Sequence, residues 1–426
     1  MALVLKYIVA ALVRYWLIHT DYWQTLSNRV EIATPLNSWK RLIEGIYLYE
    51  HDINPYEGDS FHESPLILIF FYSFLKYAPY LLPGVFTLID ILTAYFLYRT
   101  AKIFVKILKK NNTEVISEES KEMLLTDSQL DEVPEYVLSV YLFNPYSVLN
   151  CVGMTTTVVQ NLLLAVSLWG SVAGHRLVAC TFIALATHQA LYPITLIVPI
   201  SILLADANKG CNKCSYIRTL LVFVLCWGFL IYISSYIMNG SYSYVYNTYG
   251  FILNVPDLKP NIGLFWYFFT EMFEHFRLLF VCAFQINALI LYIVPLTLRF
   301  KNEPVLLATV LIALSTIFRS YPCVGDVGFY LALLPMWKHL FTFMQQKFIA
   351  GCAFIITSAL GPTVWHLWIY SGSANANFFF GVTLSFATAQ IFLITDLMFA
   401  YLKREFTLKH GSSREVDGKP AKLVLR

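Results

Sequence analysis

The sequence is poor in charged residues. Only 13% of its 426 residues are Asp, Glu, Lys or Arg, and 58% are hydrophobic. A soluble globular chain carries about 25% charged residues, so this chain has too few polar side chains to cover a surface in water. The same composition excludes a disordered protein, a coiled coil and a nucleic-acid-binding protein. The net charge of +3 identifies no partner.

Motifs for metals and disulfides are also lacking. Most of the eight cysteines lie in or at the ends of apolar runs, where they act as small hydrophobic residues. Cys211 and Cys214 form a lone CxxC pair. Because structural zinc needs four ligands and no second pair follows, no metal site is expected.

Catalytic signatures are absent as well. The sequence contains no HExxH, no G-x-S-x-G, no P-loop and no dinucleotide-binding fingerprint. No loop holds the Asp-x-Asp that a metal-dependent glycosyl transferase uses. Scattered loop acids remain, namely Asp21, Glu31, Glu44, Glu63 and Asp257, but nothing in their spacing supports catalysis. We expect no catalytic residue and no cofactor.

Long apolar runs dominate instead. A spanning helix needs about 20 mostly apolar residues. The pattern predicts an all-α integral membrane protein with about twelve transmembrane helices. They are residues 2–19, 83–105, 136–152, 156–171, 174–188, 190–205, 216–238, 277–298, 304–318, 327–346, 348–369 and 378–402. Prolines and a lysine interrupt residues 65–82, which we interpret as an interfacial or re-entrant helix.

The distribution of positive charge fixes the predicted topology. Residues 2–19 contain Lys6 and Arg14, and no small-x-small cleavage site follows, so we expect a retained first helix and not a signal peptide. With the N-terminus in the cytosol, the cytosolic side holds about three times as many Lys and Arg residues as the far side, as the positive-inside rule requires. Counting residues 65–82 as a span would destroy this bias. Both termini are therefore predicted to be cytosolic.

This topology makes residues 1–426 a single polytopic membrane domain. The lumenal side carries two long loops, 20–64 and 239–276, and the cytosolic side carries the loop 106–135 and the tail 403–426. The sequon at Asn239 falls on the lumenal side and is a predicted glycosylation site. The sequon at Asn111 falls on the cytosolic side.

The second lumenal loop contains an unusual aromatic and acidic segment, residues 263–276. Seven aromatic side chains, Phe265 and Trp266 among them, surround four polar ones at helical spacing: Thr270, Glu271, Glu274 and His275. Such a helix would lie in the membrane interface, with its rings at headgroup depth. It is either a shelf for a lipid with a polar head or an amphipathic anchor that packs on the bundle.

Two further sets of polar residues are candidates. Asn375 and Asn377 lie in a lumenal turn, where they either bind a sugar or phosphate or cap a helix. Asp90, Asp326 and Asp396 lie in or at the ends of predicted spans, where ionisable groups usually face protein or water. Asp326 would lie at the lumenal mouth. Asp90 and Asp396 are expected to pair with Arg, Ser or Thr on neighbouring helices.

Three stretches carry a family resemblance. They are Arg29–Gly45 with its continuation through Asn54–Tyr56 and Phe61–Leu66, then Val255–Phe276, and then Trp365–Phe379. Together they resemble the PIG-U family, the multi-spanning subunits of glycosylphosphatidylinositol (GPI) transamidase. The resemblance runs through most of the chain.

The resemblance implies a subunit of the endoplasmic reticulum membrane. In this family a separate caspase-like subunit performs the peptide chemistry, so this chain would be a non-catalytic partner of it and of the other transamidase subunits. Its implied role is to hold the GPI lipid. The GPI-binding residues implied by the matching motifs are Asn375 and Asn377, with Phe265, Trp266, Glu271, Glu274, His275 and Asp326 as further candidates.

The expected scaffold is similar to the GT-C fold of the lumenal mannosyl transferases of GPI synthesis. Where those enzymes carry Asp-x-Asp, this chain has Arg29 and Glu31, which suggests a vestigial transferase site. Two alternatives stay open. An active mannosyl transferase using a dolichol-linked sugar would need a lumenal base, for which Glu31 is the best candidate. A secondary transporter would need internal repeats, and none is found in the sequence.

Overall fold

The chain folds almost entirely into helices. The computed structural model describes residues 2–111, 127–208, 212–410, 415–416 and 419–420. The first half contains α1 (Ala2–Ile18), α2 (Tyr22–Leu26), α3 (Trp39–Glu50), α4 (Pro65–Tyr77), η1 (Pro79–Leu81), α5 (Leu82–Asn111), α6 (Asp127–Asp131), α7 (Val133–Phe143), α8 (Pro145–Val152), α9 (Thr157–Val172), α10 (Arg176–Ala190), η3 (Tyr192–Leu196) and α11 (Ile197–Asn208).

The second half continues in the same way. It contains α12 (Asn212–Ile237), α13 (Ser243–Val245), η4 (Tyr246–Gly250), α14 (Phe251–Asn254), α15 (Phe265–Glu271), α16 (Glu274–Ile286), η5 (Asn287–Leu291), α17 (Ile293–Phe300), α18 (Pro304–Phe318), α19 (Val324–Leu333), η6 (Leu334–Leu340), α20 (Lys347–Ile369) and α21 (Ala376–His410). Two short strands, β1 (Glu415–Val416) and β2 (Lys419–Pro420), pair antiparallel.

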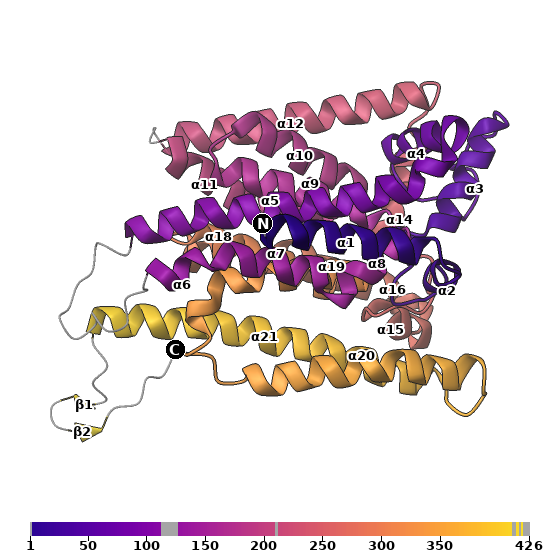
Figure 1. The fold of residues 1–426 in the computed structure, drawn as a ribbon. Coiled ribbons are helices and arrows are strands. Elements are labelled where there is room, and N and C mark those ends of the chain that lie inside the picture. The colour runs from indigo at the N-terminus through magenta and orange to yellow at the C-terminus, as the bar shows by residue number, and fades with distance from the viewer. Residues whose placement is uncertain (1, 112–126, 209–211, 411–414, 417–418, 421–426) are drawn as a thin grey trace.

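The long helices lie roughly parallel in one bundle (Figure 1). Helices α2, α3, α4 and α15 gather at one end of the bundle, and α6 lies at the other. Helices α2, α3 and α15 belong to the predicted lumenal loops and α4 to the predicted interfacial element, so we call that end the loop end. Helices α20 and α21 lie side by side as a hairpin along one flank of the bundle (Figure 1).

Five helices of the described residues are long and apolar enough to cross a membrane. They are Pro79–Lys110, Lys213–Ile237, Glu274–Phe300, Lys347–Ile369 and Ala376–Leu408, and each contains one of the predicted spans. The other seven predicted spans coincide with shorter or interrupted helices. Residues 136–152, for example, form two helices that meet at Asn144. The structure therefore confirms a helical chain that has five candidate membrane spans among its described residues, and the number twelve stays a prediction.

Residues 65–82 form a separate element, as their prolines indicate. Ser64 begins α4 by accepting a hydrogen bond from the amide of Ile67, and Pro65 occupies the first turn. The helix stops at Ala78, where the backbone is extended, and α5 begins at Leu82. With 13 residues, α4 is shorter than a spanning helix needs to be. Its predicted interfacial position stays a prediction.

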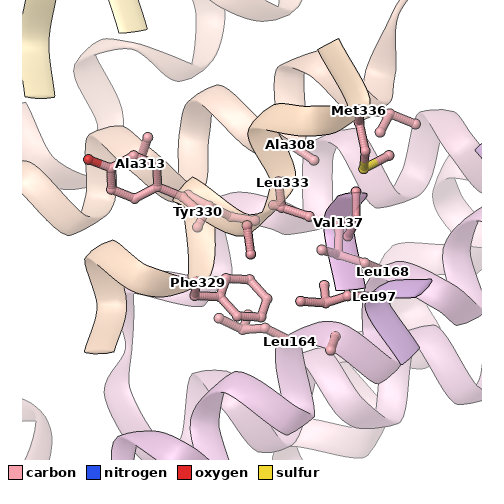
Figure 2. Close-up of a cluster of buried hydrophobic side chains, with 14 of the residues drawn as sticks. Leu97, Val137, Leu164, Leu168, Ala308, Ala313, Phe329, Tyr330, Leu333 and Met336 are labelled. Atoms are coloured by element: carbon pink, nitrogen blue, oxygen red, sulfur yellow. The ribbon is translucent and has the colours of Figure 1, made fainter. Parts of the chain in front are cut away.

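The core of the bundle is a dense apolar cluster, part of which is drawn in Figure 2. Leu97 of α5, Leu164 of α9 and Phe329 of α19 are fully or almost fully buried there. Val137, Leu168, Ala308, Ala313, Tyr330, Leu333 and Met336 complete the labelled set. Because every one of these helices contributes side chains to the same cluster, the central helices form one packed unit.

An ion pair lies within this unit. Arg14 of α1 is fully buried, and its Nε donates to Asp90 Oδ2 of α5 at 2.5 Å. The Tyr141 hydroxyl donates to the other carboxylate oxygen at 2.7 Å. The pairing of Asp90 with an arginine of a neighbouring helix confirms the prediction for this residue.

Arg14 also bonds a backbone carbonyl at the break between two helices. Pro145 has no amide hydrogen, and the amide of Tyr146 bonds the Asn144 side chain and not the Leu142 carbonyl four residues earlier. Arg14 Nη1 donates to that Leu142 carbonyl at 2.9 Å. Arg14 therefore balances the Asp90 charge and also satisfies a backbone group that the break between α7 and α8 exposes.

Candidate functional site

The predicted vestigial transferase pair lies in the turn after α2. Arg29 donates to Glu31 through two nitrogens, Nε at 3.1 Å and Nη2 at 2.8 Å. The Glu31 carbonyl accepts from the amide of Val324, the first residue of α19, at 2.9 Å. This bond fixes the turn against the loop end of the bundle. The best candidate base of the transferase alternative is therefore held by a guanidinium.

Arg29 and Glu31 line a cavity of about 310 Å³. Its walls come from α2, α8, α19 and the α20–α21 hairpin, so it lies where the hairpin meets the bundle. Most of the lining is apolar, including Leu149, Val382 and Phe386. The polar lining residues other than the ion pair are hydroxyl-bearing: Tyr22, Thr25, Tyr146, Thr357, Ser358 and Thr383. We call this space the hairpin cavity.

The shape and lining of the hairpin cavity suit a lipid. Ligand cavities usually measure 300–1,000 Å³ and are mainly apolar with a few placed polar groups. Arg29 is the single cation of the lining, and it belongs to a loop-end turn. An ideal Cβ added to Gly361 of α20 would lie 3.9 Å from Glu31 Oε1, which shows how closely the hairpin approaches the ion pair. An apolar ligand with one polar end therefore matches the space.

The turn between α20 and α21 carries the two predicted asparagines. Gly372 adopts a positive φ of 64° there, a conformation that glycine accepts without strain. The Asn375 side-chain oxygen accepts from the amide of Phe378 at 3.2 Å. Asn375 is therefore the N-cap of α21, as the capping interpretation of this turn requires. Both asparagine side chains are exposed.

Asn377 is the asparagine that connects two elements. Its side-chain oxygen accepts a hydrogen bond from the Tyr267 hydroxyl of α15. The amide nitrogen of an asparagine carries two further donors. Asn377 therefore lies at the loop end of the hairpin with one side-chain oxygen used by the chain and donor groups in reach of solvent.

The aromatic segment has its largest rings inside the protein. Trp266 is 3% exposed and packs on Trp368 and Phe379 of the hairpin. Tyr267 stacks on Phe380 with ring centroids 4.4 Å apart. Phe265 is 1% exposed and belongs to a separate cluster. Phe265 and Trp266 are packing residues in the structure, and α15 attaches the loop end of the hairpin to the bundle, which favours the second interpretation of this segment, an anchor that packs on the bundle.

The segment is also not one continuous helix. α15 ends at Glu271, Met272 and Phe273 are extended, and α16 begins at Glu274. The expected polar face is therefore divided between two helices. Glu271, Glu274 and His275 are all exposed, but they do not share a face in the way that helical spacing predicts.

Asp326 has a structural role within the chain. Its carboxylate accepts from Arg319 at 2.5 Å and from the Cys323 amide at 3.0 Å, and it begins α19 with a capping box. Asp326 and Arg319 line a cavity of only about 20 Å³, which is room for about one water molecule. No headgroup fits there, so the structure does not place Asp326 with the other candidates.

Sequence reasoning missed a buried polar cluster at the loop end. Glu63 is 5% exposed and accepts a hydrogen bond from the Thr156 hydroxyl. Asn37 donates to Thr157 Oγ1 at 2.8 Å. Burial raises the pKa of Glu63 to about 8. The sequence shows this glutamate only as one of several loop acids, and its pairing with a threonine 93 residues later leaves no local signal.

A second buried array resembles a catalytic relay without an opening. His188 of α10 contacts Ser234 Oγ through Nε2 and the Tyr249 hydroxyl through Nδ1, both at 2.8 Å. Ser234 is fully buried and His188 is 2% exposed. The array joins α10, α12 and η4 inside the protein. His188 is therefore a buried packing residue with both ring nitrogens hydrogen-bonded.

The remaining predicted sites are simple to place. Asn239 follows the end of α12, is exposed and has a φ of 53°. Among the described residues, no three His, Cys, Asp or Glu side chains lie close enough to hold a metal ion. Cys211 lies outside the described residues, and Cys214 is exposed.

Known proteins match the whole chain. A family model described as GPI transamidase subunit PIG-U matches residues 8–386. The GPI-anchor transamidase component PIGU of Homo sapiens is 41% identical, with 100% of this chain and 99% of the relative covered. The GPI transamidase component GAB1 of Saccharomyces cerevisiae is 30% identical over 90% of both chains. A GAB1 homolog of Schizosaccharomyces pombe is 28% identical over 96% of this chain. The chain therefore belongs to the PIG-U family of GPI transamidase subunits.

Proposed function

We propose that this chain is the non-catalytic subunit of the transamidase that holds the GPI lipid in the endoplasmic reticulum membrane. Its acyl chains lie in the hairpin cavity, and its glycan faces the loop end near Asn377. In this proposal the chain spans the membrane about twelve times on a GT-C-like scaffold with both termini in the cytosol. A caspase-like subunit of the same complex supplies the catalytic residues.

The hairpin cavity is the observation that carries this proposal. It combines apolar walls with a single ion pair, Arg29–Glu31, at the loop-end turn. Burial of apolar chains is favourable by about 25 cal/mol per Å², so a cavity of this kind holds a lipid through its tails. Asn377 and the exposed turn around it lie at the end of the same hairpin. Tails and glycan of one molecule would therefore contact one structural unit.

The chemical contribution of such a subunit is positioning. GPI attachment joins the amine of the lipid glycan to the carboxyl end of a protein. Holding the amine near an acyl-enzyme converts a bimolecular reaction into an effectively unimolecular one, which removes a large part of the entropic barrier. In this proposal the chain supplies no nucleophile and transfers no proton.

Filling the hairpin cavity tests the proposal. Val382→Trp places a large ring in the cavity wall, and overpacking of this kind costs about 1–3 kcal/mol. We expect GPI attachment at limiting GPI to fall roughly tenfold while the complex still assembles. Leu384→Trp is the matched control, because Leu384 lies on the same helix, is 45% exposed and does not line the cavity. Normal attachment by the Val382 variant would remove the cavity from the mechanism.

Asn377 allows a sharper test at the glycan end. Asn377→Ala should lower attachment without changing assembly. Asn377→Asp keeps the oxygen that accepts from Tyr267 and removes the amide donors. If the asparagine only holds α15 to α21, the aspartate variant stays active. If its amide contacts the glycan, both variants lose activity at limiting GPI and recover at high GPI.

The mannosyl transferase alternative is not favoured. The relatives are named as GPI transamidase components, and Glu31 is held by Arg29 through two hydrogen bonds. A general base must be free to accept a proton from the attacking group. Sugar transfer by the purified chain that is lost in Glu31→Gln would reverse this conclusion.

A further inference from the structure

A second and larger cavity lies at the opposite end of the bundle. It measures about 750 Å³ and lies between α11, α12 and α17. Its lining residues come from most of the length of α11, Ile197 to Asp206, from the first turns of α12, and from the end of α17 with the two residues after it. The predicted topology places the end of α11, the start of α12 and the end of α17 at the cytosolic surface. We call this space the cytosolic groove.

The groove has apolar walls and a charged rim. Ile197, Ile202, Ile217, Leu220 and Leu298 form the walls. Its rim, in contrast, carries one acid and one base together with polar neutral groups: Asp206, Lys301, Asn302 and Tyr216. A groove of this kind can hold the apolar part of a ligand against its walls and the polar head at its rim, as a site for an amphipathic molecule does.

The rim charges lack ion-pair partners in the part of the chain that the structure describes. Neither Asp206 nor Lys301 forms an ion pair there. Partial burial raises the pKa of the Asp206 carboxyl, because removing the charged form from water costs free energy. The Thr297 hydroxyl on the groove wall is buried and has no hydrogen-bond partner among the described residues.

The rim charges select the kind of headgroup. Lys301 matches a phosphate, and Asp206 and Asn302 match an ammonium group. An anionic headgroup with no amine would bring its charge close to Asp206 without compensation. We propose that the cytosolic groove binds a zwitterionic glycerophospholipid, with its phosphate on Lys301, its amine on Asp206 and its acyl chains against α12 and α17. The site lies at the opposite end from the hairpin cavity and is independent of the proposed GPI site.

Lipid retention by the purified complex tests this assignment. The complex would be delipidated and incubated with an equimolar mixture of phosphatidylethanolamine, phosphatidylcholine and phosphatidylglycerol in detergent. Bound lipids would then be identified by native mass spectrometry. We expect the zwitterionic lipids to be retained about fivefold over phosphatidylglycerol, the preference that one partly exposed ion pair supplies. The ratio between the two zwitterionic lipids shows whether the amine must donate hydrogen bonds to Asp206.

Three variants separate the groove from other lipid contacts. Asp206→Asn should abolish the preference and admit phosphatidylglycerol, and Lys301→Gln should lower retention of all three lipids. Leu220→Trp fills the groove and should remove the bound lipid while the complex remains assembled. Lys347→Gln is the matched control. Lys347 is exposed at the start of α20, a helix end that the topology also predicts to be cytosolic, and it does not line the groove.

Two results would overturn the proposal. One is equal recovery of the three lipids by the wild-type complex, which means ordinary contact with bulk membrane. The other is a photoreactive residue at position 216 that crosslinks to a helix of another subunit and to no lipid, which means that the groove is a subunit interface.

Discussion

The central bundle and the loop-end half of the α20–α21 hairpin are held by different forces. The bundle contains a fully buried ion pair, Arg14–Asp90, within a continuous apolar core. At the loop end, the hairpin packs through aromatic rings around Trp266 and accepts one hydrogen bond at Asn377. Farther along α21, Ile394, Leu397 and Ala400 are fully buried in the bundle core itself. The hairpin cavity lies between these two attachments, so the candidate lipid site is enclosed by the bundle and by a hairpin that is held firmly at only one of its ends.

The comparison shows how a membrane subunit can combine a fixed scaffold with an adjustable site. Close packing and buried charges give the bundle a single arrangement. The second half of α21 belongs to the core, but the loop end of the hairpin is held by ring packing and one hydrogen bond, so we expect the loop-end contacts to change when a lipid enters. Changes in the bundle should therefore affect folding, whereas changes at the attachment should affect lipid handling.

The largest effect is expected from Arg14→Ala. This change leaves the Asp90 carboxylate buried without its partner and the Leu142 carbonyl without its donor. Breaking a buried pair in this way costs about 3–5 kcal/mol. We expect loss of the folded chain from the complex, measured as the amount co-purified with the other subunits.

The control for this prediction is another pair on the same helix. Lys6 of α1 pairs with Glu135 at 3.1 Å, and both side chains are partly exposed. Exposed pairs contribute about 0–1 kcal/mol, so Lys6→Ala should leave the yield unchanged. Equal losses from both variants would show that α1 is sensitive to any substitution and that the buried pair has no special role.

A smaller and more local effect is expected from Trp266→Ala. Truncating a buried tryptophan usually costs about 3–5 kcal/mol, but here the lost contacts join the hairpin to α15 and leave the bundle core intact. We expect assembly to persist, the turn around Gly372 to become more sensitive to limited proteolysis, and GPI attachment to fall. Tyr370→Ala, at an exposed ring of the same hairpin, is the control. Loss of assembly in Trp266→Ala would mean that hairpin and bundle fold as one unit.

The third prediction concerns pH and the Glu63 cluster on the bundle side. Burial raises the pKa of Glu63 from 4.5 to about 8, so between these values the folded chain binds one proton more than the unfolded chain. Its contribution to stability is complete below pH 4.5 and is lost as pH rises toward 8, by about 1.4 kcal/mol per pH unit. Thermal unfolding of the purified chain at pH 5 to 9 measures this slope.

Glu63→Gln should flatten that dependence, because the amide keeps the shape of the side chain and does not ionise. The variant should match the wild type at low pH and exceed its stability near pH 8. An unchanged slope in the variant would assign the pH dependence to another group. Glu57→Gln, at an exposed residue of the same loop, is the control.

The smallest effect is expected from Tyr267→Phe. The change removes the hydrogen bond to Asn377 and keeps the ring that stacks on Phe380. A typical hydrogen bond contributes about 1 kcal/mol, so we expect normal assembly and at most about a fivefold loss of attachment at limiting GPI. A loss as large as that of Trp266→Ala would make this bond, and not the ring packing, the main attachment of the hairpin.

Several features of the fold follow from local sequence patterns. The apolar runs predict where helices form, and the prolines around residue 79 separate α4 from α5. Asn375 is a helix cap, which its place before an apolar run indicates. The pairing of Asp90 with an arginine follows from the cost of an unpaired carboxylate in a membrane helix.

Other features depend on contacts that no local pattern contains. Asp396 accepts from the amides of Gln345 and Gln346 before α20, whereas the sequence predicted a side-chain partner for it. No proline or glycine in the sequence marks the helix break at Met272 and Phe273. Each of the two cavities likewise brings together segments more than 70 residues apart in the sequence. An aromatic residue such as Trp266 looks the same in the sequence whether its side chain faces lipid or protein. Only the structure shows which way the side chain points.

The contacts of Arg14 also constrain how the chain enters the membrane. An arginine at the centre of an isolated membrane helix costs about 2.5–3.5 kcal/mol on insertion scales. The Asp90 carboxylate that pairs with Arg14 is synthesised 76 residues later, and the Leu142 carbonyl that accepts from it 128 residues later. During synthesis α1 is therefore a poor lipid-facing helix until α5 and α7 have emerged. The first helix should remain beside the insertion machinery and leave it together with its later partners, so that biogenesis proceeds by release of a preassembled group of helices.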